Sequence, residues 1–211
     1  MIHQRQSLNR LAIAAVFALL GACTTPAPVP TTPDHSAASA AWAAQQQKLT
    51  ALKHWQTSGK IALRSDQASE SARLNWRQRD QQSDIKLNGP LGMGAMNINS
   101  DGKTLVVEQG KEQRVFDIST PEAIYVNTGW QLPLQALPYW LKGLPSPDYA
   151  VTSMTLNTAG DSIESLAQDG WLISYSKYTD YEGLQLPARL VAEREDIRLK
   201  VILQTWRDLI R

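Results

Sequence analysis

The side chains that most often perform catalysis are scarce in this sequence of 211 residues. It contains three histidines, His3, His35 and His54, and one cysteine, Cys23. All four precede the later, strand-rich part of the chain, so neither a Ser-His-Asp triad nor a Cys-His pair can be placed there. No group of Cys and His has the spacing of a zinc site. We therefore expect no enzyme, no metal and no other cofactor.

Two weaker chemical signals also have plain structural interpretations. Glycines recur in GPLGMG, but their spacing is not that of a dinucleotide-binding loop, and the residues that follow indicate a strand. Carboxylate pairs such as Glu193 and Glu195 fit a solvated strand face. A hydrolase that uses carboxylates alone is the one catalytic class left open, and no motif favours it.

Cys23 cannot form an intramolecular disulfide, because the chain has no second cysteine. Two arginines and no acid precede an apolar segment, residues 11–20, that is too short to span a bilayer. Small residues follow, and this order is typical of an export signal. Leu20-Gly21-Ala22-Cys23 also resembles the bacterial lipoprotein box. That resemblance implies cleavage before Cys23, a diacylglycerol on its sulfur and an acyl group on its new amino group; the alternative is an ordinary signal peptide with an incidental cysteine.

The residues after the cysteine suggest where the protein is sorted. In lipoproteins of this kind, an aspartate directly after the cysteine commonly retains the protein in the inner membrane. Thr24 therefore implies, by resemblance, sorting to the outer membrane, with the domain facing the periplasm. Residues 24–38 are rich in Pro, Thr and Ala and are expected to be a linker. The chain is thus divided into a signal peptide, 1–22, an acylated cysteine with its linker, 23–38, and one folded domain, 39–211.

Composition excludes some partners and leaves one question open. The formal net charge is +1, and the sequence shows neither a strongly basic face nor a basic-aromatic motif, so we expect no nucleic acid. Seven tryptophans is a high number for this length. Tryptophan has a large apolar body and a polar N–H group, so these residues indicate either amphipathic ligands or simply a well-filled core.

The first folded element is predicted to be a helix over residues 39–56. Trp42, Leu49, Leu52 and Trp55 recur near multiples of three and four and form one apolar stripe, and Ser39 is a suitable N-cap. The polar side carries little positive charge, which favours packing against a sheet over binding to a membrane.

Beyond this helix the apolar residues recur with a period of two, which predicts strands with one buried and one exposed face. In the second such segment, Ala72, Leu74 and Trp76 alternate with polar residues. Closely spaced runs of this kind, separated by turn residues, are typical of an antiparallel meander. The segments with apolar alternation are 58–66, 70–80, 85–87, 96–98, 105–107, 115, 162–166, 171–177, 186–193 and 197–205.

Two short helices are predicted in the middle of the chain. Thr120-Pro121-Glu122 has the cap and the first-turn proline of a helix start, and residues 133–142 form a helical stretch kinked at Pro138 and stopped by Gly143. The fold class is therefore mainly β, in the α+β sense. We expect a curved antiparallel sheet that forms a half-open barrel with an apolar cavity, covered by short helices.

The turn Gly89-Pro90-Leu91-Gly92 places a large apolar side chain where turns are normally polar. Leu91 either folds back onto the core or projects into solvent. A projecting leucine is suited to entering a membrane or to contacting a hydrophobic cargo.

Four stretches together resemble the LolB family of outer-membrane lipoprotein receptors. They are Leu20–Cys23, Trp55-Gln56-Thr57-Ser58-Gly59-Lys60, Gly89-Pro90-Leu91-Gly92 and Trp140-Leu141-Lys142-Gly143-Leu144-Pro145. The likeness extends over almost the whole mature chain, although the family's turn more often begins with Asn-Pro than with Gly89-Pro90. It implies a half-open β-barrel with a helical lid, an apolar cavity for acyl chains and a protruding leucine, Leu91, needed for membrane insertion.

The resemblance also implies partners and a direction of transfer. The chain would accept triacylated lipoproteins from a LolA-like periplasmic carrier and insert them into the lipid of the outer membrane, acting as a monomer. Pro90 and Gly92 would shape the insertion loop around Leu91. Candidates for lining the cavity are Leu74, Trp76, Ile98, Trp140, Trp171 and Tyr175, and each of these is otherwise a core residue. The rival functions are a lipocalin-like carrier of free lipid and a structural envelope lipoprotein.

Overall fold

The computed structural model describes residues 35–66, 69–90, 94–120 and 133–210, all within one compact unit, His35–Arg211. This part contains two helices, α1 (His35–Ala51) and α3 (Leu137–Trp140). Its strands are β1 (His54–Arg64), β2 (Ser69–Arg79), β3 (Gln82–Asn88), β4 (Met96–Ser100), β5 (Thr104–Gln109), β6 (Glu112–Asp117), β7 (Val151–Leu156), β8 (Ile163–Gln168), β9 (Trp171–Tyr181), β10 (Leu184–Arg194) and β11 (Ile197–Ile210). Among the described helices, neither has the length and apolar character needed to cross a membrane.

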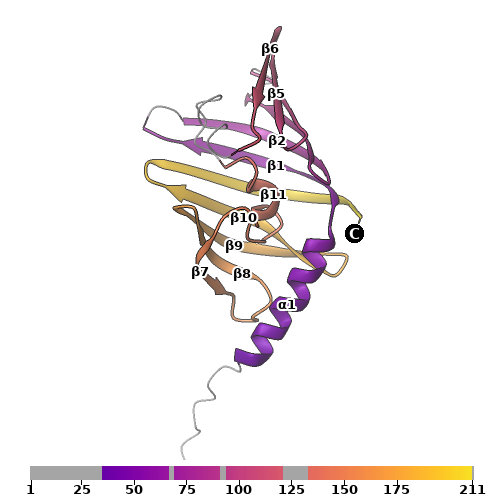
Figure 1. Cartoon of the computed structure of the whole chain (residues 1–211), viewed down its shortest axis with the longest axis vertical. Coiled ribbons are helices and arrows are strands. Elements are labelled where there is room, and N and C mark those ends of the chain that lie inside the picture. The colour runs from indigo at the N-terminus through magenta and orange to yellow at the C-terminus, as the bar shows by residue number, and fades with distance from the viewer. Residues whose placement is uncertain (1–34, 67–68, 91–93, 121–132, 211) are drawn as a thin grey trace, which may run out of the picture. The chain divides into compact units, whose positions relative to one another are not determined.

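The strands form one sheet of eleven in the order β6-β5-β4-β3-β2-β1-β11-β10-β9-β8-β7 (Figure 1). Every neighbouring pair is antiparallel, and β1 joins the two halves of the chain by pairing with β11 as well as with β2. Because β6 and β7 stand at opposite ends of this order, the sheet is curved but open. The predicted fold class, a mainly β protein built on a half-open antiparallel sheet, is confirmed.

Strict alternation gives the sheet a buried face and an exposed face. On β2, Leu74, Trp76 and Gln78 are buried, whereas Arg73 and Arg77 are exposed. The same alternation continues on β9 and β11, where the buried positions join a single hydrophobic core. We call the side that carries this core the inner face and the opposite side the outer face. The strand assignments made from the period of two are confirmed on both halves of the sheet.

The first helix starts four residues earlier and ends five residues earlier than predicted. It runs from His35 to Ala51, so Ser39 lies inside the helix rather than capping it. Trp55 belongs to β1, not to the helix, and the ladder begins just before it, where the Lys53 N–H donates to the Ile210 carbonyl. Of the predicted stripe, Trp42 and Leu49 are buried on the helix itself.

The second predicted helix is much shorter than expected. Only Leu137–Trp140 is α-helical, and Pro138 stands in the first turn, where a missing N–H removes no hydrogen bond. Pro138 therefore starts a helix and does not kink one. Gly143 then ends the helical turns with φ +77°, a conformation that costs glycine little. The helix expected at Thr120–Glu122 falls largely outside the described residues.

Strand β7 was not predicted. Its first five residues are exposed and its last is half-buried, so no apolar face appears in VTSMTL. Such an edge strand pairs on one side only and lacks the burial that produces a periodic signal.

Candidate acyl-chain site

All six residues predicted to line a cavity lie in the core on the inner face. Their side chains are between 0 and 6 % exposed. They come from both halves of the sheet and from α3: Leu74 and Trp76 on β2, Ile98 on β4, Trp171 and Tyr175 on β9, and Trp140 on α3. The structure therefore places them on the predicted face and shows them packed together.

Trp76 belongs to an aromatic group near the middle of the sheet. Its ring centroid lies 5.8 Å from that of Trp55, which is itself 5.3 Å from Trp206. The Trp76 Nε1–H donates to the Gln78 Oε1 at 2.8 Å, so this buried indole is satisfied. Strands β2, β1 and β11 are neighbours, and one tryptophan from each therefore meets on the inner face.

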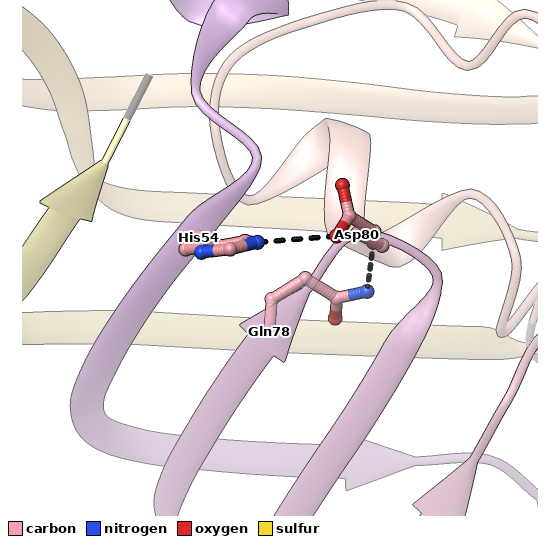
Figure 2. A network of polar contacts seen from close by, with 3 residues as sticks. All are labelled: His54, Gln78 and Asp80. Carbon is pink, nitrogen blue, oxygen red and sulfur yellow. Dashed lines mark hydrogen bonds and ion pairs between the residues drawn. The ribbon is translucent and has the colours of Figure 1, made fainter.

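Polar contacts fix the end of this group at the turn between β2 and β3. Gln78 is buried and donates from Nε2 to the Asp80 carbonyl at 2.8 Å. Figure 2 shows this contact together with a second one, from His54 to the Asp80 carboxylate. The His54 Nε2 lies 3.1 Å from the Asp80 Oδ2. The His54–Asp80 contact is largely exposed and so adds little stability.

Trp140, Trp171 and Tyr175 form a second aromatic group, and we call this group the α3 cluster. The ring centroids of Trp140 and Trp171 are 6.0 Å apart, and the Tyr175 hydroxyl donates to the Trp140 carbonyl at 3.0 Å. Burial raises the pKa of Tyr175 well above its usual value, and nearby Tyr178 raises it further, so the hydroxyl stays a donor. The α3 cluster joins the helical segment to β9.

Gln168 at the end of β8 holds the same segment in place, although sequence reasoning did not single it out. Its buried Oε1 accepts from the Trp140 Nε1–H at 3.0 Å and from the Ser146 N–H at 2.9 Å. Its Nε2 donates to the carbonyls of Ser146, at 2.9 Å, and Tyr149, at 2.8 Å. One amide therefore satisfies four polar groups between Trp140 and Tyr149. The sequence gives one clue to it, a polar residue at a buried position of the β8 alternation.

We call α3 together with the residues that follow it, 137–149, the α3 segment. Lys142 connects this segment to the C-terminus of α1. Its buried Nζ donates to the Leu49 and Leu52 carbonyls at 3.2 and 3.0 Å, where a cation also meets the negative end of the helix dipole. Burial lowers the pKa of Lys142 to about 8, and the charge of Lys53 contributes to the decrease. The two helical segments over the inner face are thus joined by a lysine.

Two buried donors have no hydrogen-bond partner among the described residues near Gln168: the Ser146 hydroxyl and the Trp171 Nε1–H. The Trp171 ring is also covered by Arg194, whose guanidinium carbon lies 5.1 Å from the ring centroid. Trp171 starts β9 directly after the turn at Asp169–Gly170, so this polar region lies at an end of the sheet.

The predicted insertion loop follows β3. Pro90 is exposed and Gly89 is half-buried, whereas Leu91 and Gly92 lie outside the described residues. Cys23 also lies outside them. The predictions for Leu91, Gly92 and Cys23 therefore remain predictions.

The outer face is polar and contains a pocket of about 390 Å³ across β2 to β5. Arg77, Arg79, Asp84 and Asp101 line it together with uncharged side chains. Hydrogen bonds from the backbone of Thr104 and Lys103 lower the pKa of Asp101, so this carboxylate is charged at neutral pH. Within the described ranges, no group of three or more His, Cys, Asp or Glu could hold a metal ion.

Comparison with known proteins identifies the family. Residues 53–206 match the family described as "Outer membrane lipoprotein LolB". Curated relatives with the description "Outer-membrane lipoprotein LolB" include one from Pseudomonas putida strain GB-1, 38 % identical over 78 % of this chain and 80 % of its own. Another, from Pseudomonas fluorescens strain Pf0-1, is 37 % identical over 79 % of this chain and 80 % of its own.

Solved structures resemble the chain at low sequence identity. A LolA superfamily protein, NE2245 from Nitrosomonas europaea, is 11 % identical, with a TM-score of 0.46 over 80 % of this chain and 94 % of its own. A DUF1329 family protein from Desulfovibrio piger is 9 % identical, with a TM-score of 0.46 over 84 % of this chain and 93 % of its own. The family match and the curated relatives are decisive: the chain belongs to the LolB family of outer-membrane lipoproteins.

Proposed function

We propose that this protein is an outer-membrane receptor that accepts lipoproteins from a LolA-like periplasmic carrier and inserts them into the membrane. The family match over residues 53–206 carries the proposal, because it includes all of β1 to β10 and most of β11. Acylation of Cys23, which the lipoprotein box supports, would hold the domain at the membrane by two or more lipid chains.

The cargo determines what the receptor must do. A triacylated lipoprotein carries on the order of 45 methylenes, and exposing all of them to water would cost about 36 kcal/mol as an upper figure. The chains must therefore pass directly from one apolar interior to the next. Transfer in one direction follows if the receptor binds the chains more tightly than the carrier does and the membrane binds them more tightly still.

The packed inner face indicates how an acyl chain would enter. Because the candidate residues are at most 6 % exposed, a chain can bind among them only if side chains move apart. The α3 segment is held by side-chain hydrogen bonds through Gln168, Tyr175 and Lys142, whereas the sheet below it is held by backbone ladders. We infer that the α3 segment moves, and that Trp140 separates from Trp171 and Tyr175 to admit the chain.

The second step, insertion, is assigned to the loop after β3. The exposed Pro90 stiffens the start of this loop, and Leu91 follows it. An apolar side chain next to a proline at a strand end can enter the lipid headgroup region without unfolding the sheet. Leu91 would then act on delivery and not on acceptance.

The test follows a client lipoprotein through both steps. A soluble chain that begins at Thr24 is mixed with a carrier–lipoprotein complex, and liposomes are then added. The parent protein should take the client and deliver it, whereas Leu91→Glu should take it but fail to deliver it. Val115→Glu is the matched control, because Val115 is an exposed apolar residue on the edge strand β6, with 63 % of its surface exposed. This variant should perform both steps.

Other outcomes would point elsewhere. If the parent chain never takes the client, the receptor function is wrong. Binding of free fatty acid without any exchange with the carrier would instead indicate a lipocalin-like protein. A protein that binds neither lipid nor client would fit a structural envelope lipoprotein.

A further inference from the structure

Basic side chains gather on the outer face of the sheet, although the chain as a whole has a formal net charge of only +1. Composition did not indicate a strongly basic face, and the structure corrects this. Six exposed residues from β10, β11, β1, β2 and β3 define what we call the basic face: Arg189, Lys200, Lys60, Arg73, Arg77 and Lys86.

The strand register makes the basic face continuous. Arg189 pairs with Ile202, Ile202 with Lys60, and Lys60 with Arg73, so three cations lie on one row across four neighbouring strands. Neighbouring strands are about 4.8 Å apart, which makes the row about 15 Å wide. Lys200 lies two residues from Ile202 along β11, and Lys86 pairs with Asn75, the residue between Arg73 and Arg77 on the outer side of β2.

Acidic residues neutralise little of this face. Arg77 lies 4.0 Å from Asp84, and the other five cations have no ion pair within the described part of the chain. On the outer side of β10, Glu193 is already paired with Arg198, with 2.7 Å between the Glu193 Oε1 and the Arg198 Nη1. Like charges on adjacent strands repel each other, so the arrangement costs the free fold some stability and favours an anionic surface as its partner.

A membrane anchor at Cys23 indicates which anionic surface the basic face would meet. His35, the start of α1, is twelve positions after Cys23, and a fully extended chain spans about 40 Å over twelve positions. A membrane anchor at Cys23 would therefore keep the domain within that distance of a lipid surface. Arg73 also pairs with Asn88, the last residue of β3, so the basic face reaches the strand end from which the Leu91 loop begins.

We propose that the basic face is a docking surface for the anionic phospholipid headgroups of the leaflet that holds the anchor. This docking proposal rests on the anchoring of Cys23 and not on lipoprotein transfer, so the docking and the receptor function can fail separately. Docking would turn the outer side of β1, β2 and β11 toward the lipid and leave the inner face and the α3 segment accessible to a carrier. The attraction is electrostatic and must weaken with salt.

The experiment uses the whole processed chain, purified in detergent from its host membrane and reconstituted into vesicles. Cys23 is the only cysteine, and in the processed chain its sulfur is blocked by the lipid, so an introduced thiol can be labelled alone. A fluorophore on Asn75→Cys reports on the basic face, and one on Thr152→Cys, exposed on β7, reports on a distant edge. Energy transfer to a headgroup-labelled lipid is measured in phosphatidylcholine vesicles with and without phosphatidylglycerol.

We expect transfer from Asn75→Cys to increase at least twofold with phosphatidylglycerol and to fall back between about 0.1 M and about 1 M salt, where the screening length shortens from about 10 to about 3 Å. The Asn75→Cys protein that also carries Lys60→Glu, Arg73→Glu and Lys200→Glu should show no increase in energy transfer with phosphatidylglycerol. Adding Lys48→Glu, Lys103→Glu and Lys111→Glu, which changes the charge equally outside the face, should preserve it.

Three results would overturn the proposal. The first is energy transfer from Asn75→Cys that does not depend on phosphatidylglycerol. The second is an equal loss of the phosphatidylglycerol response in both triple variants. The third is a basic face that binds the acidic surface of a carrier protein, in a salt-sensitive way, but shows no response to anionic lipid. The salt titration uses the unaltered face, so the docking is tested even if a triple variant folds poorly.

Discussion

Lys142 is the residue at which burial and charge conflict most directly. Lys142 is only 6 % exposed, and the partners of its ammonium group are two carbonyls rather than a carboxylate. Burial makes the charged form expensive, but either protonation state can donate to both carbonyls. The connection between α1 and the α3 segment therefore persists when the lysine loses its proton.

This conflict predicts how stability depends on pH. The pKa of Lys142 is about 8 in the folded chain and 10.5 in its ordinary state, so between these values the unfolded chain binds more protons and the free energy of unfolding rises with pH. Relative to Lys142→Met, the parent should gain about 2 kcal/mol between about pH 7 and about pH 9.5. Urea unfolding of both proteins measures this gain, and a difference independent of pH would contradict it.

Gln168 illustrates what single residues reveal only in a structure. A buried glutamine at a strand end reads as an irregularity in the β8 alternation, yet its amide satisfies four polar groups of the α3 segment. The partners between Trp140 and Tyr149 are about twenty to thirty positions earlier in the chain, and no local pattern predicts such pairings. Trp76 and Trp171 were easier to place, because the alternation of their strands fixed the face on which they lie.

At the scale of elements, β1 is the strand on which both halves of the sheet depend, and Gly59 is its tightest point. The pairing of β1 with β11 shifts between Ser58 and Gly59. A Cβ at Gly59 would collide with the Ile202 carbonyl and would lie 3.0 Å from the Leu203 Cα. These are backbone atoms, so they cannot turn aside as a flexible side chain does.

Gly59→Ala should therefore destabilise the protein by more than about 2 kcal/mol, because β11 must shift to admit the methyl group. Thermal and urea unfolding measure the loss. Ser71→Ala on the exposed side of β2 serves as the control and should change stability by less than about 0.5 kcal/mol. If alanine is tolerated equally at both positions, the close approach of β1 and β11 is not rigid.

Elements were predictable where burial follows one period and not where two periods overlap. Trp55 continues the spacing of Trp42 and Leu49 on α1, and it also begins the alternation with Thr57 on β1. Trp55 adopts the strand conformation because β1 pairs with β2 and β11. The residues of β11 are about 150 positions away in the sequence, so no local pattern reveals this pairing. Alternation also cannot separate a residue that lines a cavity from one that fills the core, because both point to the same side.

At the scale of the whole described domain, charge and stability are distributed unevenly. The basic face needs strands from both ends of the sequence, so neither composition nor any local run of lysine and arginine reveals it. Stability also differs between the parts of the domain. The backbone ladder of β1, β2 and β11 crosses the centre of the sheet, whereas side chains alone carry the ties of the α3 segment to that sheet.

This difference predicts two levels of opening. The amide N–H groups from Trp140 to Leu144 bond within their own turns, so they can be exposed when the segment moves without breaking a ladder. In hydrogen exchange, amides of residues 140–144 should open at a lower free energy than those of β1. Tyr175→Phe removes the hydroxyl bond to the Trp140 carbonyl and should speed exchange of residues 140–144 about fivefold, the ratio that corresponds to about 1 kcal/mol.

The rest of the sheet provides the internal control for this change. Exchange in β1 should respond to Tyr175→Phe only through the small loss of global stability, because the hydroxyl has no bond to that strand. Equal protection of α3 and β1, or equal acceleration of both in the variant, would mean that the domain opens as one cooperative unit. An acyl chain would then need global unfolding to reach Trp140, Trp171 and Tyr175, and entry beneath the α3 segment would be wrong.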